Sequence, residues 1–104
     1  MGWFDWYQPI EDLRCPICKV ALKEWQGKDG QCALAIWRQG HSAPVGQMVD
    51  DEVKMPQEII DTWRLPETFE IYSYDCGKHC VIAEGRIEGE IWALTKIISV
   101  NITL

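Results

Sequence analysis

The sequence has no apolar run long enough for a membrane-spanning helix. Its longest uninterrupted apolar stretch, Cys32 to Trp37, has six residues, whereas a spanning helix takes about 20. The first residues also lack the basic and apolar regions of a secretory signal peptide. Trp6 stands where a myristoylation motif needs Ser or Thr. These absences predict a cytoplasmic protein without a membrane anchor.

Basic residues and catalytic motifs are also scarce. The chain has 10 Lys and Arg against 16 Asp and Glu, a formal net charge of −6, which disfavours binding to a phosphate backbone. With only two histidines, it contains no His-Glu-x-x-His run, no Gly-rich phosphate loop and no Gly-x-Ser-x-Gly element. We therefore expect a protein that is not an enzyme.

What is present is an ordinary globular composition in a short chain. The 104 residues are 47% hydrophobic and 25% charged, as is typical of a folded domain. Folding at this length buries only roughly 60 to 70% of the unfolded surface, so a metal site would add useful stability. We expect residues 1–104 to form a single domain.

Alternating patterns predict that most of the regular structure is β. Residues 20–25 and 31–38 alternate on either side of a turn at Gly27–Gly30, which predicts a β-hairpin. Three further strands are expected, over residues 68–74, 81–86 and 91–100.

One helix is expected between the two groups of strands. Pro56 can occupy the first position of a short helix whose face carries Ile59, Ile60 and Trp63. The first fourteen residues read as an irregular aromatic segment that ends in a turn. The predicted fold class is therefore mainly β, a β-rich α+β protein with an antiparallel sheet and one short helix.

Four of the five cysteines form two spaced pairs, Cys15-x2-Cys18 and Cys76-x3-Cys80. An odd number of cysteines in a chain without an export signal favours metal binding or redox chemistry over disulfides. Two such pairs can complete a tetrahedral Zn²⁺ site. The arrangement resembles a zinc ribbon, in which two cysteine-containing turns, called knuckles, bind one structural zinc ion. This pattern is similar to that of a small bacterial-type protein of this kind. The resemblance implies a zinc-ribbon-like domain with these four cysteines as ligands.

The fourth ligand has an alternative. Cys76-x2-His79 restores the more usual spacing and would give a Cys₃His site instead of a Cys₄ site. We slightly favour Cys80 over His79.

Cys32 and His41 offer a rival completion of the first pair. Cys32 shares strand parity with Leu34 and Ile36, and unpaired cysteine is among the most buried residue types. We therefore expect Cys32 in the core and His41 in a solvated loop.

Charge asymmetry favours a protein partner. Residues 50–70 hold seven acidic but only two basic residues, and such a segment could meet a basic surface. An inhibitor or immunity-type protein that covers a basic site is one such case. The aromatic N-terminus, with Trp3, Phe4, Trp6 and Tyr7, is a second possible contact surface, although covering an edge of the core is the simpler interpretation.

Two other functions stay open. A nucleic-acid-binding zinc ribbon could use bases stacked on aromatic rings and a cluster of cations. The residues concerned are Trp25, Trp37, Lys19, Lys23, Lys28 and Arg38. The Cys15-Pro-Ile-Cys18 segment also resembles the active-site dithiol of glutaredoxins, but that dithiol needs a following helix, which the β-like alternation here does not predict.

Overall fold

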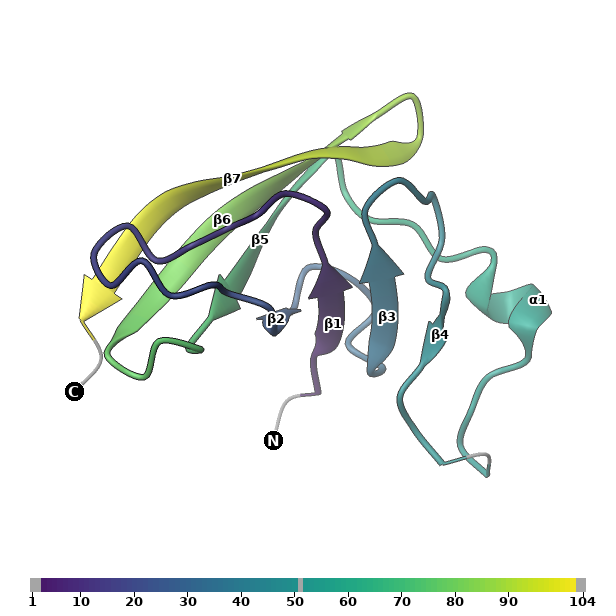
Figure 1. Ribbon diagram of the computed structural model, residues 1–104. Coiled ribbons are helices and arrows are strands. Elements are labelled where there is room, and N and C mark those ends of the chain that lie inside the picture. The colour runs from purple at the N-terminus through teal and green to yellow at the C-terminus, as the bar shows by residue number, and fades with distance from the viewer. Residues whose placement is uncertain (1–2, 51, 103–104) are drawn as a thin grey trace.

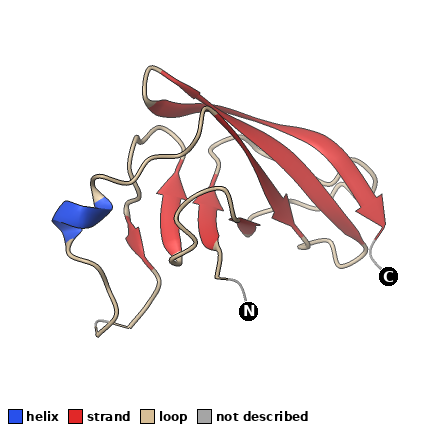
Figure 2. Cartoon of the chain, turned by 180° about the vertical axis from the view of Figure 1, so that it is seen from behind, coloured by secondary structure: helices blue, strands red, loops and turns tan. Residues whose placement is uncertain are grey.

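The computed structural model describes residues 3–50 and 52–102, and within them seven strands form one sheet beside a single short helix (Figures 1 and 2). The strands are β1 (Asp5–Gln8), β2 (Trp25–Gly27), β3 (Ala35–Arg38), β4 (Gly46–Gln47), β5 (Thr68–Ser73), β6 (His79–Glu88) and β7 (Ile91–Ile102). The helix is α1 (Gln57–Ile60). The predicted mainly β fold class is confirmed. None of the described helical structure has the length and apolar character needed to cross a bilayer.

The sheet has the order β4-β3-β1-β2-β5-β6-β7. All neighbouring strands are antiparallel except β1 and β3, which are parallel. The three strands expected after residue 68 are confirmed as the long β5–β6–β7 meander, whose last turn contains Gly89 at a positive φ of 60°. In Figure 1 this meander forms one curved layer, and β1 and β3 stand beside it.

The N-terminal half differs from the prediction. The expected hairpin of residues 20–25 and 31–38 is wrong, because β1 lies between β2 and β3 and pairs with both. The first fourteen residues are not all irregular, since β1 forms within them. Residues 20–24 form no strand apart from an isolated bridge between Arg14 and Ala21.

Aromatic side chains fill the space between the N-terminal strands β1 to β3 and the β5–β6–β7 meander. The ring of Tyr7 stacks on Phe69 with centroids 5.6 Å apart. Trp92 meets Phe69 and Tyr7 edge-on, at 5.3 and 6.0 Å. Trp25 and Trp37 are also buried, so both belong to the core. Because β1 and β7 are far apart in the sheet order, the Tyr7–Trp92 contact shows that the sheet curls over its own core.

A buried carboxylate organises the loop between β2 and β3. Asp5 is fully buried, and it accepts hydrogen bonds from the backbone N–H groups of Cys32, Ala33 and Ala35. A fourth hydrogen bond comes from the indole Nε1 of Trp37, at 2.9 Å. Four donors compensate for the cost of burying a charge. They also explain why this loop, and not a tight turn, follows β2.

The helix confirms the prediction in position but not in extent. Pro56 precedes its first residue, and Ile60 is fully buried. Ile59, which was expected on the same face, is 41% exposed. Within the helix only Ile60 is buried, and Trp63 and Leu65, which follow it, pack against the core.

Replacing Asp5 with Asn should destabilise the protein by about 2 to 3 kcal/mol, because the amide offers one acceptor oxygen to four converging N–H donors. Denaturant-induced unfolding measures the change. The same substitution at exposed Asp12 is the control and should cost less than about 0.5 kcal/mol. Equal unfolding midpoints for the two variants would contradict the role given to Asp5.

Candidate metal centre

The first cysteine pair lies in a short loop closed by backbone hydrogen bonds. The N–H of Leu22 donates to the carbonyl of Leu13 at 2.9 Å, and that of Cys15 donates to Val20 at 3.0 Å. The backbone N–H of Lys19 donates to the carbonyl of Cys15 at 2.8 Å. Lys19 has a positive φ of 65°, which reverses the direction of the chain. This closed loop is the first knuckle.

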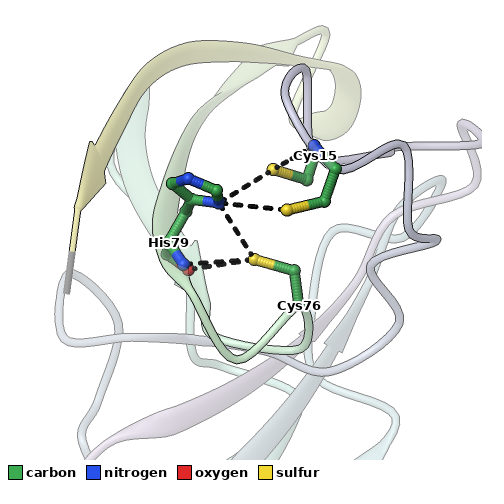
Figure 3. A group of neighbouring side chains, drawn as sticks. Cys15, Cys76 and His79 are labelled. Atoms are coloured by element: carbon green, nitrogen blue, oxygen red, sulfur yellow. Dashed lines mark hydrogen bonds between the residues drawn. The ribbon is translucent and has the colours of Figure 1, made fainter.

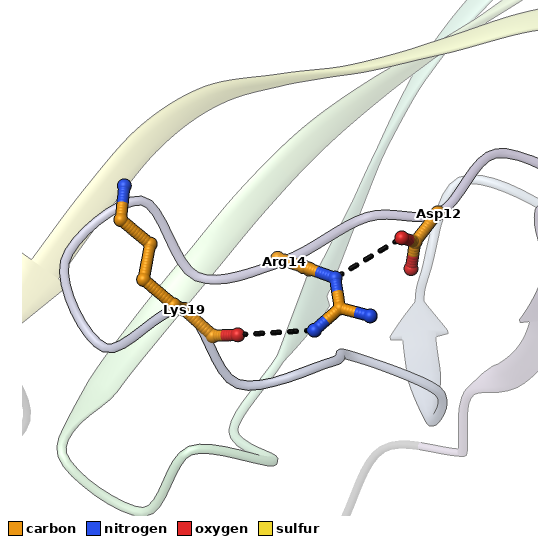
Figure 4. A network of polar contacts seen from close by, with 3 residues as sticks. All are labelled: Asp12, Arg14 and Lys19. Carbon is orange, nitrogen blue, oxygen red and sulfur yellow. Dashed lines mark hydrogen bonds and ion pairs between the residues drawn. The ribbon is translucent and has the colours of Figure 1, made fainter.

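An arginine braces the first knuckle from outside. Figure 4 shows Arg14 between the carboxylate of Asp12, 3.0 Å from its Nε, and the carbonyl of Lys19, 3.3 Å from its Nη1. The pair with Asp12 is exposed to solvent, so it is worth at most about 1 kcal/mol. Closure of the knuckle therefore depends mainly on its backbone.

The second knuckle is the turn that leads into β6. Gly77 has a positive φ of 74°, and its N–H donates to the carbonyl of Tyr74 at 2.9 Å. The N–H of His79 then donates to Sγ of Cys76 at 3.2 Å. A matching bond in the first knuckle runs from the N–H of Cys18 to Sγ of Cys15, at 3.4 Å. Such bonds stabilise negative charge on sulfur.

The two knuckles bring three sulfur atoms around one ring nitrogen (Figure 3). Nδ1 of His79 lies 3.6 Å from Sγ of Cys15, 3.2 Å from Sγ of Cys18 and 3.5 Å from Sγ of Cys76. All four ligand atoms lie within 4.8 Å of one another. A ring nitrogen can make one hydrogen bond, as donor or as acceptor. Three equivalent approaches are better explained by a shared ion, and the group is close enough to hold one.

The two thiols of the first knuckle have opposite electrostatic environments. The N–H of Cys18 donates to Sγ of Cys15 and lowers the pKa of that thiol, against the opposing effect of burial. Burial raises the pKa of Cys18, and the neighbouring Cys15 raises it further. The Cys15 thiol therefore loses its proton more readily than an ordinary cysteine, and the Cys18 thiol less readily. A bound cation would favour the deprotonated form of both.

The fourth member of the group is His79, the alternate ligand, and not Cys80. Strand β6 begins at His79, and successive side chains in a strand point to opposite faces. His79 therefore shares a face with buried Val81, while Cys80 lies on the other face, where its contact with Tyr74 raises the pKa of that phenol. A strand that starts at residue 79 cannot direct both side chains to Cys76. The spacing of His79 was visible in the sequence, but the start of β6 at this residue was not, because the alternating pattern predicted a strand only from residue 81.

The other candidates lie outside the group. Cys32 is only partly buried, and its thiol donates to the carbonyl of Lys28 at 3.2 Å. The prediction that Cys32 lies in a strand is wrong, because this residue has a positive φ of 55° in the loop around Asp5. His41 is exposed, as expected. No disulfide joins any of the five cysteines.

Comparisons with protein families, with curated proteins and with solved structures find no match to this chain.

Replacing His79 with Ala should weaken metal binding at least about tenfold, because it removes one of four ligands. Replacing the neighbouring Cys80 with Ser is the matched control and should leave the affinity unchanged. Titration with Co²⁺, followed by its visible absorption, measures both. The reverse result, with binding lost only in the Cys80 variant, would refute the assignment of His79.

Proposed function

We propose that this protein is a non-catalytic domain held together by a structural Zn²⁺ ion and that it acts by binding another protein. The spacing of the four ligand atoms supports zinc. In a tetrahedral site with zinc–sulfur distances of about 2.3 Å and zinc–nitrogen distances of about 2.0 Å, sulfur and nitrogen lie about 3.5 Å apart. The three sulfur atoms lie 3.2 to 3.6 Å from Nδ1 of His79.

The donor set favours a structural role for the ion. Three thiolates and one imidazole are a ligand set typical of structural zinc, whereas catalytic zinc keeps one position open for water or substrate. Cys15, one of the two sulfur ligands of the first knuckle, is fully buried. Two knuckles around one ion are the feature shared with zinc ribbons.

The ion would join parts of the chain that are far apart in sequence. Fifty-seven residues separate Cys18 from Cys76, and closing a long loop removes entropy from the unfolded chain. Apparent binding energies of structural zinc sites are about 10 to 16 kcal/mol, whereas a whole domain is stable by about 5 to 15 kcal/mol. Metal binding and folding should therefore be coupled.

Purified protein should contain one zinc ion per chain by elemental analysis, and chelation should unfold or loosen it. Amide spectra and melting temperature measure the change, and added Zn²⁺ should restore both. Metal-free protein that keeps its melting temperature and its dispersed amide spectrum would argue against a structural ion. Iron in place of zinc would contradict the identity of the metal.

The proposed partner surface is formed by residues 48–50 and 52–61, most of which belong to the acidic segment 50–70. It exposes large apolar side chains, of which Met48 and Val53 are 59% and 58% exposed. Met55 and Ile59 are exposed as well. Acidic residues are interspersed with them, and Glu52 and Glu58 are also exposed. Exposed methionine and isoleucine next to carboxylates suit an apolar patch with a basic rim on another protein. This is the surface expected of an inhibitor or immunity-type protein.

The proposed partner surface lies at the opposite end of the molecule from the two knuckles, as both views show (Figures 1 and 2). The N-terminal aromatic residues supply less exposed surface. Trp3 is 49% exposed, but Phe4 and Trp6 are partly buried and pack edge-on at 5.1 Å. Residues 48–50 and 52–61 therefore offer more apolar surface for a partner. The zinc ion would contribute to partner binding only by stabilising the fold.

Neutralising Asp50, Glu52 and Glu58 to the corresponding amides should reduce recovery of the partner from the native lysate at least about tenfold at low salt, because the basic rim loses its counterpart. The control neutralises three acids of the β6–β7 hairpin, Glu84, Glu88 and Glu90, which changes the net charge equally. Quantitative mass spectrometry of the captured proteins gives the measurement. Equal loss in both variants, or in neither, would exclude the segment.

The two alternative functions have less support. Trp25 and Trp37 are each only 1% exposed, so they cannot stack on the bases of a nucleic acid. A glutaredoxin-like dithiol needs a helix that begins at the motif. The residues that follow Cys18, from 19 to 24, contain no helix.

A further inference from the structure

Asp75 connects the two halves of the metal centre. One of its carboxylate oxygens, Oδ2, accepts hydrogen bonds from the backbone N–H of Lys23 and from that of Glu24, the latter at 2.9 Å. Asp75 itself directly precedes Cys76. The sequence pattern did not single out this residue, because an exposed aspartate beside a turn is common.

The partners of Asp75, Lys23 and Glu24, directly follow the closed loop of the first knuckle. Leu22, next to Lys23, donates its N–H to Leu13 and so closes the loop that carries Cys15 and Cys18. A shift of residues 23 and 24 would therefore move the two sulfur atoms of this knuckle together.

Asp75 is also held in place on the side of β5. The backbone N–H of Asp75 donates to the hydroxyl of Ser73 at 3.3 Å, and Ser73 is buried at the end of β5. Asp75 is itself exposed and is not one of the four grouped residues. Its contacts thus serve neither the core nor coordination, but they span the gap between the two ligand pairs.

We infer that Asp75 is a positioning residue for the metal centre, which holds the first knuckle at ligand distance from Cys76 and His79. The inference rests on the proposed zinc site. Groups that orient ligands without touching the metal typically change its affinity by 10- to 100-fold when they are removed. Asp75 would act in the same way, on a pair of ligands at once.

Replacing Asp75 with Ala should lower Zn²⁺ affinity about 10- to 100-fold, as measured by competition with a chromogenic chelator. Asp29 provides the matched control, because its Oδ2 accepts the backbone N–H of Glu70 at 2.9 Å, away from the ligands. The Asp29→Ala variant should change the affinity less than about threefold. Asp75→Asn keeps an acceptor oxygen in place and should recover most of the lost affinity.

The outcomes separate the inference from the proposed function. Wild-type protein that binds no metal would overturn both. Wild-type protein that binds zinc while Asp75→Ala binds it equally well would overturn the positioning role alone. An Asp75→Asn variant as weak as Asp75→Ala would show that the negative charge matters and the hydrogen bonds do not, which also contradicts the inference. A similar loss in the Asp29 variant would reduce the effect to general stability.

Discussion

The approach of three sulfur atoms to one imidazole nitrogen is the constraint on which the left-hand end of the molecule in Figure 1 depends. The N-terminal part of the sheet joins β5 through β2, and this junction has a single paired position, Gln26 with Tyr72. The hydrogen bonds of Asp75 and Asp29 add to this junction. The group of Cys15, Cys18, Cys76 and His79 is a further link between the same two parts of the chain.

A buried carboxylate and an aromatic cluster fix the rest of the fold. Asp5 gathers the loop before β3, while Tyr7, two residues later on the same strand face, meets Trp92 of β7. One short strand, β1, thereby holds both a polar and an apolar contact to distant segments. The group of three cysteines and His79 lies close to β1 along the chain, since the first knuckle begins within seven residues of the end of this strand. Small domains bury little surface, so these few contacts have a large effect.

The sequence predicted the parts of this structure that depend on local pattern. The β5–β6–β7 meander follows from alternation and a Gly-containing turn, and the two knuckles follow from cysteine spacing. The position of β1 could not be predicted in this way. Its residues alternate, but inward-facing Asp5 is polar, and its burial becomes favourable only when the N–H groups of residues 32 to 35 surround it. In the same loop Cys32 takes a positive φ and lies before β3. The alternating pattern had instead predicted a strand there, with the Cys32 side chain on its buried face.

The choice between His79 and Cys80 shows the limit of spacing as a guide. Both residues lie close enough to Cys76 in sequence to share an ion with it, and cysteine is the more frequent partner in paired knuckles. What decides is the residue at which β6 begins, because alternation then assigns the two side chains to opposite faces. That boundary depends on pairing with β7, which joins His79 to Ile102 at the far end of the chain.

X-ray absorption at the zinc edge of the purified protein tests the central claim most directly, because it counts the ligands of each kind around the ion. The structure predicts three sulfur neighbours at about 2.3 Å and one nitrogen at about 2.0 Å. Four sulfur neighbours would place Cys80 in the site, and a shell dominated by oxygen would mean that the two knuckles do not hold the metal.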